Sequence, residues 1–339
     1  MKAVIVKAPG IVAVEVIPEP VVEDYDALCS VLASGICNGT DNNIVMNDPY
    51  HKVKFPAVLG HEGIGKVIAL GKKVRFLKIG DMITRIFQKL PEGSGYQILY
   101  GAFAERAVAT DWQAMKEDGL LESEYNKYRV HRVLPRGFDP IESTLIITWR
   151  ETFAYLSKLK PEAGQNVLII GSGGNAMAFL DHVKNLNMSS GIIGNPLLKE
   201  KFLRKGADFF ISYKEGKLSD ILLQTKKTFD IILDTIGEPE TLQKALPTLK
   251  PRGKIGVYGL DNFLEYKVVP RDLSFLNGEK YDEASAHDSI IDFIQKNKLN
   301  AWDYISKDYI YPLTKIIDAL RAGEEKKVLK SVIDMSRLI

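Results

Sequence analysis

Cysteine is scarce in this chain, and its scarcity excludes one class of protein. The 339 residues contain two cysteines, Cys29 and Cys37. A single pair cannot form the framework of a disulfide-rich secreted domain, so the composition favours a reducing cytoplasm. Long apolar runs are also missing, because no stretch approaches the roughly 20 residues that a membrane-spanning helix needs. The N-terminus alternates apolar residues at Val4, Val6 and Ala8, which predicts a strand and not a signal peptide.

The chain also lacks an excess of charge of either sign. Lys and Arg number 45 and Asp and Glu number 43, which gives a net charge of +2 spread along the chain. The sequence therefore predicts neither a nucleic-acid partner nor an anionic membrane partner. With 45% apolar and 26% charged residues, the composition is that of an ordinary globular protein. Because 339 residues are many for one core, we expect two domains.

The N-terminal part of the chain has the pattern of a β-rich domain. Short β-rich runs are separated by Gly, Pro and Asp clusters, which predicts a compact barrel-like domain. These runs are 27–33, 58–70, 82–87 and 102–109. Residues 116–135 are charged and irregular and predict surface loop and helix. After Pro140, apolar residues at helical spacing predict a helix from Ile141 to Leu159.

The pattern then changes to strands alternating with helices. Predicted strands cover 167–170, 191–194, 209–211, 231–235 and 254–258, and the first two are followed by helices that end near Asn187 and Gly206. This alternation predicts an α/β fold with a doubly wound parallel sheet. Two amphipathic segments, 284–295 and 313–321, and a last strand near 328–333 complete the chain.

A thiol, an imidazole and a carboxylate lie close together in the β-rich part. Cys37 is followed, within 26 residues, by His61 and Glu62 in a Gly-His-Glu-Gly motif. A soft thiolate, an imidazole and a carboxylate are suitable ligands for a catalytic zinc. The sequence therefore predicts one zinc site with Cys37, His61 and Glu62 as its metal ligands.

A glycine turn follows the first strand of the alternating part. Gly171, Gly173 and Ala176 satisfy the pattern G-x-G-x-x-A between a Val-Leu-Ile-Ile strand and a helical stretch. The first glycine permits the tight turn, the second lets the backbone approach a pyrophosphate, and the helix N-terminus faces the phosphates. The predicted cofactor-binding residues of this turn are Gly171, Gly173, Gly174, Asn175 and Ala176.

The choice of cofactor depends on the end of the next strand, where NAD sites carry an acid. Here Ile193 is followed by Gly194 and Asn195, with no acid, and Lys199 and Arg204 come soon after. The absence of an acid favours NADP over NAD, with Asn195 and Lys199 as further cofactor contacts. An acid introduced at Gly194 is then expected to favour NAD.

At this point the chain resembles a known family. Gly-Ile-Cys-Asn-Gly-Thr-Asp (35–41), Gly-His-Glu-Gly-Ile-Gly (60–65), Gly-Asp (80–81), Gly-Ala-Phe-Ala-Glu (101–105) and the glycine turn occur in the order found in the zinc-dependent medium-chain dehydrogenase/reductase superfamily. The superfamily includes alcohol, polyol, threonine and sugar dehydrogenases. The resemblance implies a GroES-like catalytic domain formed by 1–147 and 281–339, and a Rossmann domain formed by 148–280. It also implies a homodimer or homotetramer that pairs near 273–276.

The resemblance assigns roles to single residues. Cys37 and His61 resemble two catalytic zinc ligands, and Glu62 resembles an acid that ligates the metal in some relatives and lies behind it in others. Thr40 resembles the hydroxyl residue that contacts the substrate oxygen and passes its proton outward. Residues 146–149, where relatives carry a further Cys or Glu ligand, contain none. Glu62, Glu142 and Glu151 are therefore the candidates for the third ligand: Glu62 is preferred, and the other two lie nearby in the chain.

Three departures from the family pattern are visible. The loop at Cys37 is one residue longer than the usual Cys-Gly-Thr-Asp, and Asn43 stands where alcohol dehydrogenases often carry a relay histidine. Residues 82–100 contain no cysteine, whereas relatives with a structural zinc carry four there. One catalytic zinc and no structural zinc is therefore the expectation.

These features predict an enzyme: a zinc-dependent, NAD(P)-dependent alcohol dehydrogenase. It would transfer a hydride between the nicotinamide and a secondary alcohol or ketone of a small polyol, sugar or related alcohol. A zinc-free quinone or enone reductase of the same superfamily is one alternative. A nucleotide-binding protein without turnover is the other.

Overall fold

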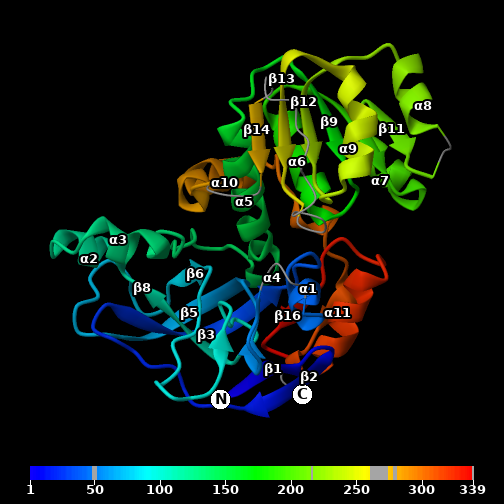
Figure 1. The fold of residues 1–339 in the computed structure, drawn as a ribbon. Helices are drawn as coiled ribbons and strands as arrows, with labels where there is room; N and C mark the ends of the chain where they lie inside the picture. The colour runs from blue at the N-terminus through cyan, green and yellow to red at the C-terminus, as the bar shows by residue number, and fades with distance from the viewer. Residues whose placement is uncertain (48–51, 215–216, 260–273, 278–280, 338–339) are drawn as a thin grey trace. The chain divides into compact units, whose positions relative to one another are not determined.

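The structure is a computed structural model, and it describes residues 1–47, 52–214, 217–259, 274–277 and 281–337. The chain forms two compact units, Met1–Thr148 with Asn300–Ile339, and Trp149–Leu299. Each unit is drawn with its elements labelled in Figure 1. Within the described residues, no helix has both the length and the apolar character needed to span a membrane.

The first unit is rich in strands. Up to residue 148 it contains β1 (Lys2–Ala8), β2 (Ile11–Val16), β3 (Asp26–Gly35), α1 (Asp41–Val45), β4 (Ala57–Val58), β5 (Glu62–Leu70), β6 (Met82–Thr84), β7 (Gln97–Ile98), β8 (Arg106–Thr110), α2 (Trp112–Glu117), α3 (Glu122–Tyr125) and α4 (Pro140–Ser143). The C-terminal segment adds β15 (Ile310–Tyr311), α11 (Ile316–Glu324) and β16 (Val332–Asp334). The described strands form one sheet in the order β2-β1-β4-β7 and a second in the order β15-β16-β3-β5-β6, with β8 paired to β3.

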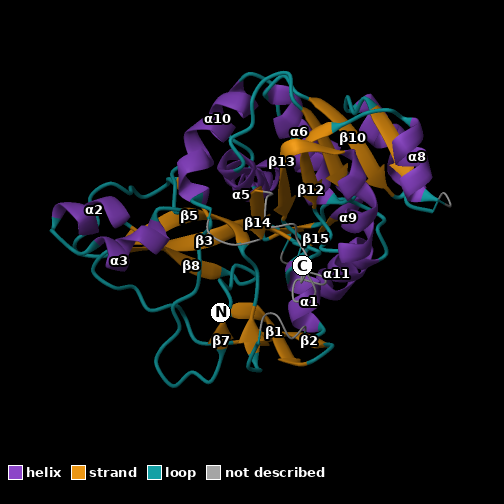
Figure 2. Cartoon of the chain, turned by 45° about the horizontal axis from the view of Figure 1, so that its top comes forward, coloured by secondary structure: helices purple, strands orange, loops and turns teal. Residues whose placement is uncertain are grey.

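Strand β3 is central to the second of these sheets, and Figure 2 shows it beside β5 and β8. Its alternating side chains at Ala27, Cys29 and Val31 are buried in the main core of the unit. Burial raises the pKa of the Cys29 thiol to about 12. Cys29 is therefore an inert core residue, and the reactive cysteine of the chain is to be sought at Cys37.

The C-terminal segment returns to the end of β3. Strand β16 pairs antiparallel with β3, with Val332 opposite Gly35. The Ile36 N–H donates to the Ser331 carbonyl at 2.9 Å. The last strand of the chain is thereby fixed beside the loop that carries Cys37.

The second unit contains an alternating α/β arrangement. Its strands are β9 (Asn166–Ile170), β10 (Ser189–Gly194), β11 (Phe209–Ser212), β12 (Phe229–Asp234), β13 (Leu249–Val257) and β14 (Ser274–Asn277). Helix α5 (Leu145–Lys158) leads into it, and α6 (Gly174–Asn185), α7 (Lys199–Arg204), α8 (Leu218–Gln224), α9 (Pro239–Ala245) and α10 (His287–Gln295) follow. The strand order is β11-β10-β9-β12-β13-β14, and every pair is parallel. In order of appearance this is 3-2-1-4-5-6, the order of a Rossmann sheet, so the predicted α/β fold is confirmed.

Three predicted elements differ from the observed ones for local reasons. The run 58–70 is two strands, because Gly60 turns the chain with a φ of +98°. A Cβ at Gly60 would lie 2.6 Å from the Phe103 nitrogen, so only glycine fits there. The run 82–87 ends as a strand at Thr84, because Arg85 has a φ of +62°. The run 102–109 becomes regular only at Arg106.

The domain boundary predicted at residue 280 also differs from the boundary in the structure. Residues 281–299 belong to the second compact unit and not to the first. Arg150 donates a hydrogen bond to Glu283, and the Phe293 ring packs edge-on against Phe153 at a centroid distance of 5.6 Å. These contacts attach α10 and the turn before it to α5.

Candidate metal centre and nucleotide loop

Cys37, His61 and Glu62 are brought together by the pairing of β3 with β5. Cys37 follows β3, while Glu62 is the first residue of β5 and lies opposite Gly35. A donor atom from each of the three residues lies within 4.8 Å of the other two. His61 and Glu62 are buried and Cys37 is partly exposed. The cluster therefore presents a thiolate, an imidazole and a carboxylate to one point, which fits the donor chemistry of zinc.

Asp41 orients two members of this cluster. Its Oδ2 accepts the Cys37 N–H at 2.9 Å, and its Oδ1 lies 3.6 Å from His61 Nδ1. Burial lowers the pKa of His61, but the hydrogen bonds and charges of Asp41 and Cys37 outweigh it and hold the pKa well above its ordinary value. A carboxylate behind a histidine fixes its ring orientation and raises its basicity. The sequence reading missed Asp41, although it closes the Thr-Asp end of the loop.

Lys330 is the second residue that the sequence reading missed. Its Nζ donates to both carboxylate oxygens of Glu62, at 2.6 and 2.7 Å, and the Thr148 hydroxyl donates to Oε1 at 3.0 Å. Burial raises the pKa of Glu62, but the charges of Lys330 and His61 and the hydrogen bonds bring the pKa below its usual value. Glu62 is therefore ionised at neutral pH. The signal for Lys330 was a single lysine inside the apolar run 328–333.

Glu62 is also the only carboxylate of the cluster within the described residues. Its Oε2 packs against the backbone of β3, because a Cβ at Gly35 would lie 2.3 Å from it. Glu142 instead accepts a hydrogen bond from Trp302 Nε1 at 2.8 Å and is not part of the cluster. Glu151 lies in the second compact unit.

The extra residue in the Cys37 loop does not separate Thr40 from Cys37. Cys37 Sγ lies 3.5 Å from the Thr40 hydroxyl, which accepts its hydrogen bond. Asn38 packs against α11, where a Cβ at Gly323 would lie 1.8 Å from Asn38 Oδ1. The loop therefore takes up its additional residue against a glycine of the C-terminal segment.

The glycine loop between β9 and α6 fits a pyrophosphate. Gly171 has a φ of +120°, and a Cβ there would lie 2.1 Å from Thr235 Oγ1. Gly173 is the N-cap of α6 without any side-chain cap, and a Cβ there would meet nothing within 4 Å. The buried Ala176 packs α6 close to the sheet. The uncapped N–H groups of the helix and the open space at Gly173 suit an anion.

The end of β10 corrects the expectation for Gly194. A Cβ at Gly194 would lie 2.6 Å from the Ser172 Cβ, so no acid can be placed there without moving the loop. Asn195 follows, donating its N–H to Ser172 Oγ at 2.9 Å and accepting from the Leu197 N–H at 3.2 Å. Asn195 is thus the first residue after β10 that carries a side chain. Lys199 is exposed at the start of α7.

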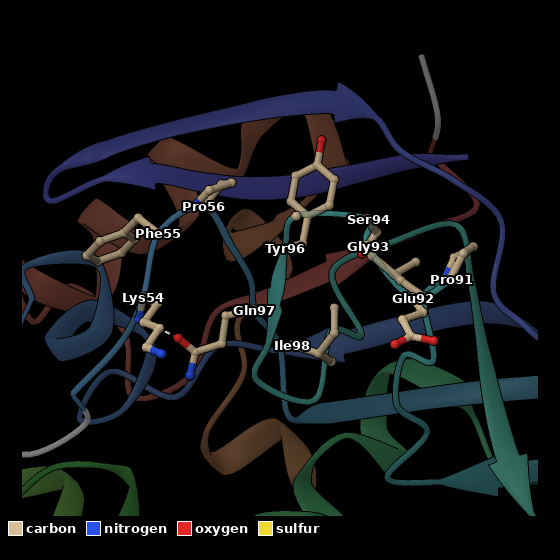
Figure 3. Close-up of a pocket in the computed structure, with 12 residues that line it drawn as sticks. Lys54, Phe55, Pro56, Pro91, Glu92, Gly93, Ser94, Tyr96, Gln97 and Ile98 are labelled. Carbon is tan, nitrogen blue, oxygen red and sulfur yellow. Dashed lines mark hydrogen bonds between the residues drawn. The ribbon is translucent and has the colours of Figure 1, made fainter.

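An open pocket of about 530 Å³ lies elsewhere in the first unit, between residues 54–56 and 90–98 (Figure 3). Lys54 donates its N–H to Gln97 on one side of it. Tyr96 and Ile98 pack against the small apolar cluster formed with β1. None of the three donor residues lines this pocket, and its loop contains no cysteine.

Comparisons with known proteins agree with these observations. Residues 23–118 match the model of the alcohol dehydrogenase GroES-like domain. A sorbitol dehydrogenase of Bacillus subtilis strain 168 is 26% identical over 293 residues, which cover 83% of this chain and 80% of the relative. D-arabinitol dehydrogenase 1 of Uromyces fabae is 24% identical over 254 residues, covering 71% and 70%. A solved short chain alcohol dehydrogenase from E. coli CFT073, complexed with NADH, matches at a TM-score of 0.80 and 18% identity over 99% of each chain.

Proposed function

This chain belongs to the zinc-type medium-chain dehydrogenase/reductase superfamily and is an alcohol dehydrogenase, and on that premise we propose that it is zinc-dependent and NADP-linked. The proposed substrate is a secondary alcohol, or the matching ketone, of a small polyol or sugar. The observation that carries the proposal is the cluster of Cys37, His61 and Glu62, whose donor atoms lie within 4.8 Å of one another. The polyol class is supported by the names of the sorbitol and arabinitol dehydrogenases that the chain resembles.

The chain's own residues have distinct parts in the proposed reaction. Cys37, His61 and Glu62 would hold zinc, while Asp41 keeps the first two oriented. Zinc, when bound, polarises the substrate oxygen so that a hydride can pass to or from the nicotinamide. The Thr40 hydroxyl, beside Cys37 Sγ, is positioned to hold the proton of that oxygen.

Lys330 has the part of a counter-charge. Its ammonium group contacts both oxygens of Glu62. A thiolate and a buried carboxylate in one cluster repel one another, and a buried cation offsets part of that repulsion. Lys330 therefore keeps Glu62 ionised and in place whether or not metal is bound.

The proposed cofactor site is the loop at Gly171–Ala176 with Asn195. NADP is preferred in this proposal because Asn195 brings no negative charge toward a 2′-phosphate. Lys199 and Arg204 are exposed cations on the helix that follows. A kcat/KM that is clearly higher with NAD would show that the missing acid does not decide the cofactor.

We also propose that the protein is a homodimer or homotetramer. Among the described strands, β14 forms one edge of the parallel sheet and pairs with β13 alone. An unpaired strand edge invites association, and pairing it with a second copy removes that hazard. Leu273, part of the stretch that the sequence singled out, lies outside the described residues. The free thiols of Cys29 and Cys37 suit the proposed cytoplasmic location.

Metal analysis combined with turnover tests the central proposal. Purified protein is expected to carry up to one zinc per chain and to oxidise sorbitol or a related polyol with NADP. Cys37→Ser and His61→Ala are each expected to remove the zinc and to lower kcat/KM by about 10³-fold or more, because polarisation by zinc contributes several kcal/mol. Cys29→Ser, in the core away from the cluster, controls for the loss of a thiol.

Two other outcomes point to the alternatives. Full activity in protein shown by elemental analysis to be metal-free, on quinones or enones, would replace the proposal by a zinc-free reductase. Cofactor binding without turnover on any carbonyl or alcohol would favour a nucleotide-binding protein.

A further inference from the structure

Tyr100 is an exposed aromatic residue beside the candidate metal ligands, and the proposed mechanism does not use it. The Tyr100 ring centroid lies 6.0 Å from that of His61, with the rings tilted by 52°. Tyr100 is 47% exposed, whereas His61 is buried. Large aromatic residues that remain exposed beside a buried polar cluster are typical of ligand-binding surfaces.

Arg85 also contacts the Tyr100 ring. The Arg85 guanidinium carbon lies 4.6 Å from the Tyr100 ring centroid, a cation–π contact. Such contacts contribute about 0.5–1 kcal/mol at exposed sites. Tyr100 is therefore fixed between a cation and a candidate metal ligand.

The backbone at both residues is in an unfavourable conformation. Tyr100 has a φ of +65° and Arg85 a φ of +62°, in the left-handed region that bulky side chains rarely adopt. Gly101 follows with a φ of +88°, and a Cβ there would lie 2.3 Å from Gln88 Cγ. Arg85 is fixed by its N–H, which donates to the Gly63 carbonyl at 2.8 Å.

Strain of this kind costs stability and persists where surrounding structure enforces it, most often at ligand sites. Glycine at position 100 would adopt the same conformation without strain. Tyrosine at position 100 therefore makes the folded protein less stable than glycine would, as far as backbone strain is concerned. Among the left-handed residues other than glycine, Tyr100 is distinguished by its ring contact with His61, a candidate metal ligand.

We propose that Tyr100 contacts the substrate and selects for a polyhydroxylated carbon chain over a simple alcohol. This inference rests on the proposed function, in which the reacting oxygen is held at Cys37, His61 and Glu62. The aromatic face packs against the C–H groups of a polyol or sugar, and the phenol hydroxyl can donate to or accept from a substrate hydroxyl. A simple alcohol such as propan-2-ol has no further carbons with hydroxyl groups to meet it.

The experiment compares Tyr100→Gly and Tyr100→Phe with the wild type in zinc-loaded protein. The readout is the ratio of kcat/KM for sorbitol to kcat/KM for propan-2-ol, together with zinc content and Tm. Lys226→Gly is the matched control, because Lys226 is an exposed left-handed residue, with a φ of +52°, in the other compact unit.

The expected result has three parts. Tyr100→Gly lowers the selectivity ratio by about tenfold or more, through KM for sorbitol, because a contact formed equally in ground and transition states changes KM. Its zinc content stays at the wild-type level, and its Tm holds or rises by about 2–4 °C because strain is relieved. Tyr100→Phe lowers the ratio by a smaller factor, and Lys226→Gly keeps the wild-type ratio.

Other results overturn the inference. An unchanged ratio in Tyr100→Gly would show that the ring does not meet the substrate. A joint loss of zinc and Tm would show that Tyr100 only shields His61. If the wild type turns over propan-2-ol and not sorbitol, and calorimetry detects no sorbitol binding, the substrate class is wrong while the alcohol dehydrogenase activity stands. If it turns over neither, the proposed function itself fails.

Discussion

The candidate metal centre in the first unit (the metal half) and the candidate nucleotide loop in the second (the nucleotide half) are formed by different kinds of groups. In the first unit, four ionisable side chains, Asp41, His61, Glu62 and Lys330, are buried and contact one another or the cluster thiol. In the second unit, the loop at Gly171 consists of glycines, backbone N–H groups and small side chains. The first site depends on charges that compensate one another inside the protein, and the second on the absence of side-chain atoms.

The two sites should therefore fail in opposite ways. Removing a charge from the metal half leaves its partner in a low-dielectric environment, so an isosteric substitution is already costly. In the nucleotide loop, Gly171 leaves no room for an added carbon, because its backbone passes within contact distance of Thr235 in the turn after β12. The following predictions test this contrast, from the largest expected effect to the smallest.

Glu62→Gln should have the largest effect. It preserves shape but removes the charge that Lys330 contacts through two hydrogen bonds. Breaking a buried ion pair costs about 3–5 kcal/mol of unfolding free energy. Zinc affinity should also fall by about 10–100-fold or more, as for other residues that hold or orient a metal. Urea unfolding and competition with a zinc chelator measure the two effects.

The double variant Glu62→Gln/Lys330→Met is the control for Glu62→Gln. It removes both charges, so it should recover much of the stability without recovering zinc affinity. If Glu62→Gln keeps stoichiometric zinc while its rate falls, Glu62 lies behind the metal and is not a ligand. Loss of zinc in Glu142→Gln or Glu151→Gln instead would reassign the third ligand to one of those residues.

Gly171→Ala tests the nucleotide half by adding one carbon. The methyl group would lie 2.1 Å from Thr235 Oγ1 on a backbone with a φ of +120°. Backbone strain and overpacking together should cost about 2–4 kcal/mol of stability. Gly173→Ala is the matched variant, because its methyl group meets no protein atom within 4 Å. It should stay within about 0.5 kcal/mol of wild type while binding of NADP, measured by fluorescence titration, weakens.

An equal loss of stability in both glycine variants would contradict this assignment. It would mean that Gly173 is required for packing and not for access to a phosphate. Unchanged NADP binding in Gly173→Ala would place the pyrophosphate elsewhere.

His182 tests the limits of this comparison, because it is a buried titratable group in the second unit, where the nucleotide loop itself has no charged side chain. It lies in α6, with its Nε2 2.9 Å from the Thr152 hydroxyl. Burial lowers the pKa of His182 from 6.5 to about 3. The folded state therefore keeps His182 neutral, while the unfolded chain takes up a proton below pH 6.5. Stability conferred by the neutral form is present above pH 6.5 and is lost as the pH falls toward 3.

From pH 7 to pH 5, this group alone should lower the unfolding free energy by about 2 kcal/mol. His182→Gln, which cannot titrate, should show a correspondingly smaller loss in urea unfolding across that range. Thr152→Val keeps the histidine and should keep the wild-type pH dependence. Equal acid sensitivity of wild type and His182→Gln would show that other groups dominate.

The smallest expected effect is on cofactor choice. Asn195→Asp should shift the ratio of kcat/KM for NADP to that for NAD by about tenfold toward NAD, because a carboxylate repels a 2′-phosphate and binds ribose hydroxyls. Gly194→Asp should instead fail to fold well, since its side chain would meet Ser172. A ratio unmoved by Asn195→Asp would place the 2′-phosphate beyond the reach of that residue.

Local patterns were enough to predict much of this molecule. The alternation of strands and helices after residue 165 led to the parallel sheet, because each βα unit is encoded within about 30 residues. Cys37, His61 and Glu62 were found because their residue types and order suit one metal, and their proximity in the fold agrees with that prediction. The family model and the curated relatives support the family that these motifs indicated, and the solved structure supports its fold.

Contacts between distant parts of the chain could not be predicted in this way. Lys330 reaches Glu62 across 268 positions, and nothing near either residue specifies the other. The 281–299 segment joins the second unit through Arg150 and Phe153, which its amphipathic pattern does not identify. The space at Gly194 is limited by Ser172 from a neighbouring loop. The glycine in the sequence does not reveal that a larger residue would meet Ser172 there.

The pairing of β16 with β3 has a consequence for synthesis of the protein on the ribosome. The segment that completes the sheet beside Cys37 is translated after all the other described strands, and Lys330 lies just before it. Until then, Glu62 is a carboxylate without its counter-ion, and β3 lacks its neighbour β16. A nascent chain can thus form its parallel sheet before the first unit is complete. The pairing of β16 with β3 joins distant parts of the chain, and pairing of this kind is slow. Premature termination a few residues before β16 should yield chains that retain a nucleotide fold, lack a metal centre and expose a strand edge to proteolysis.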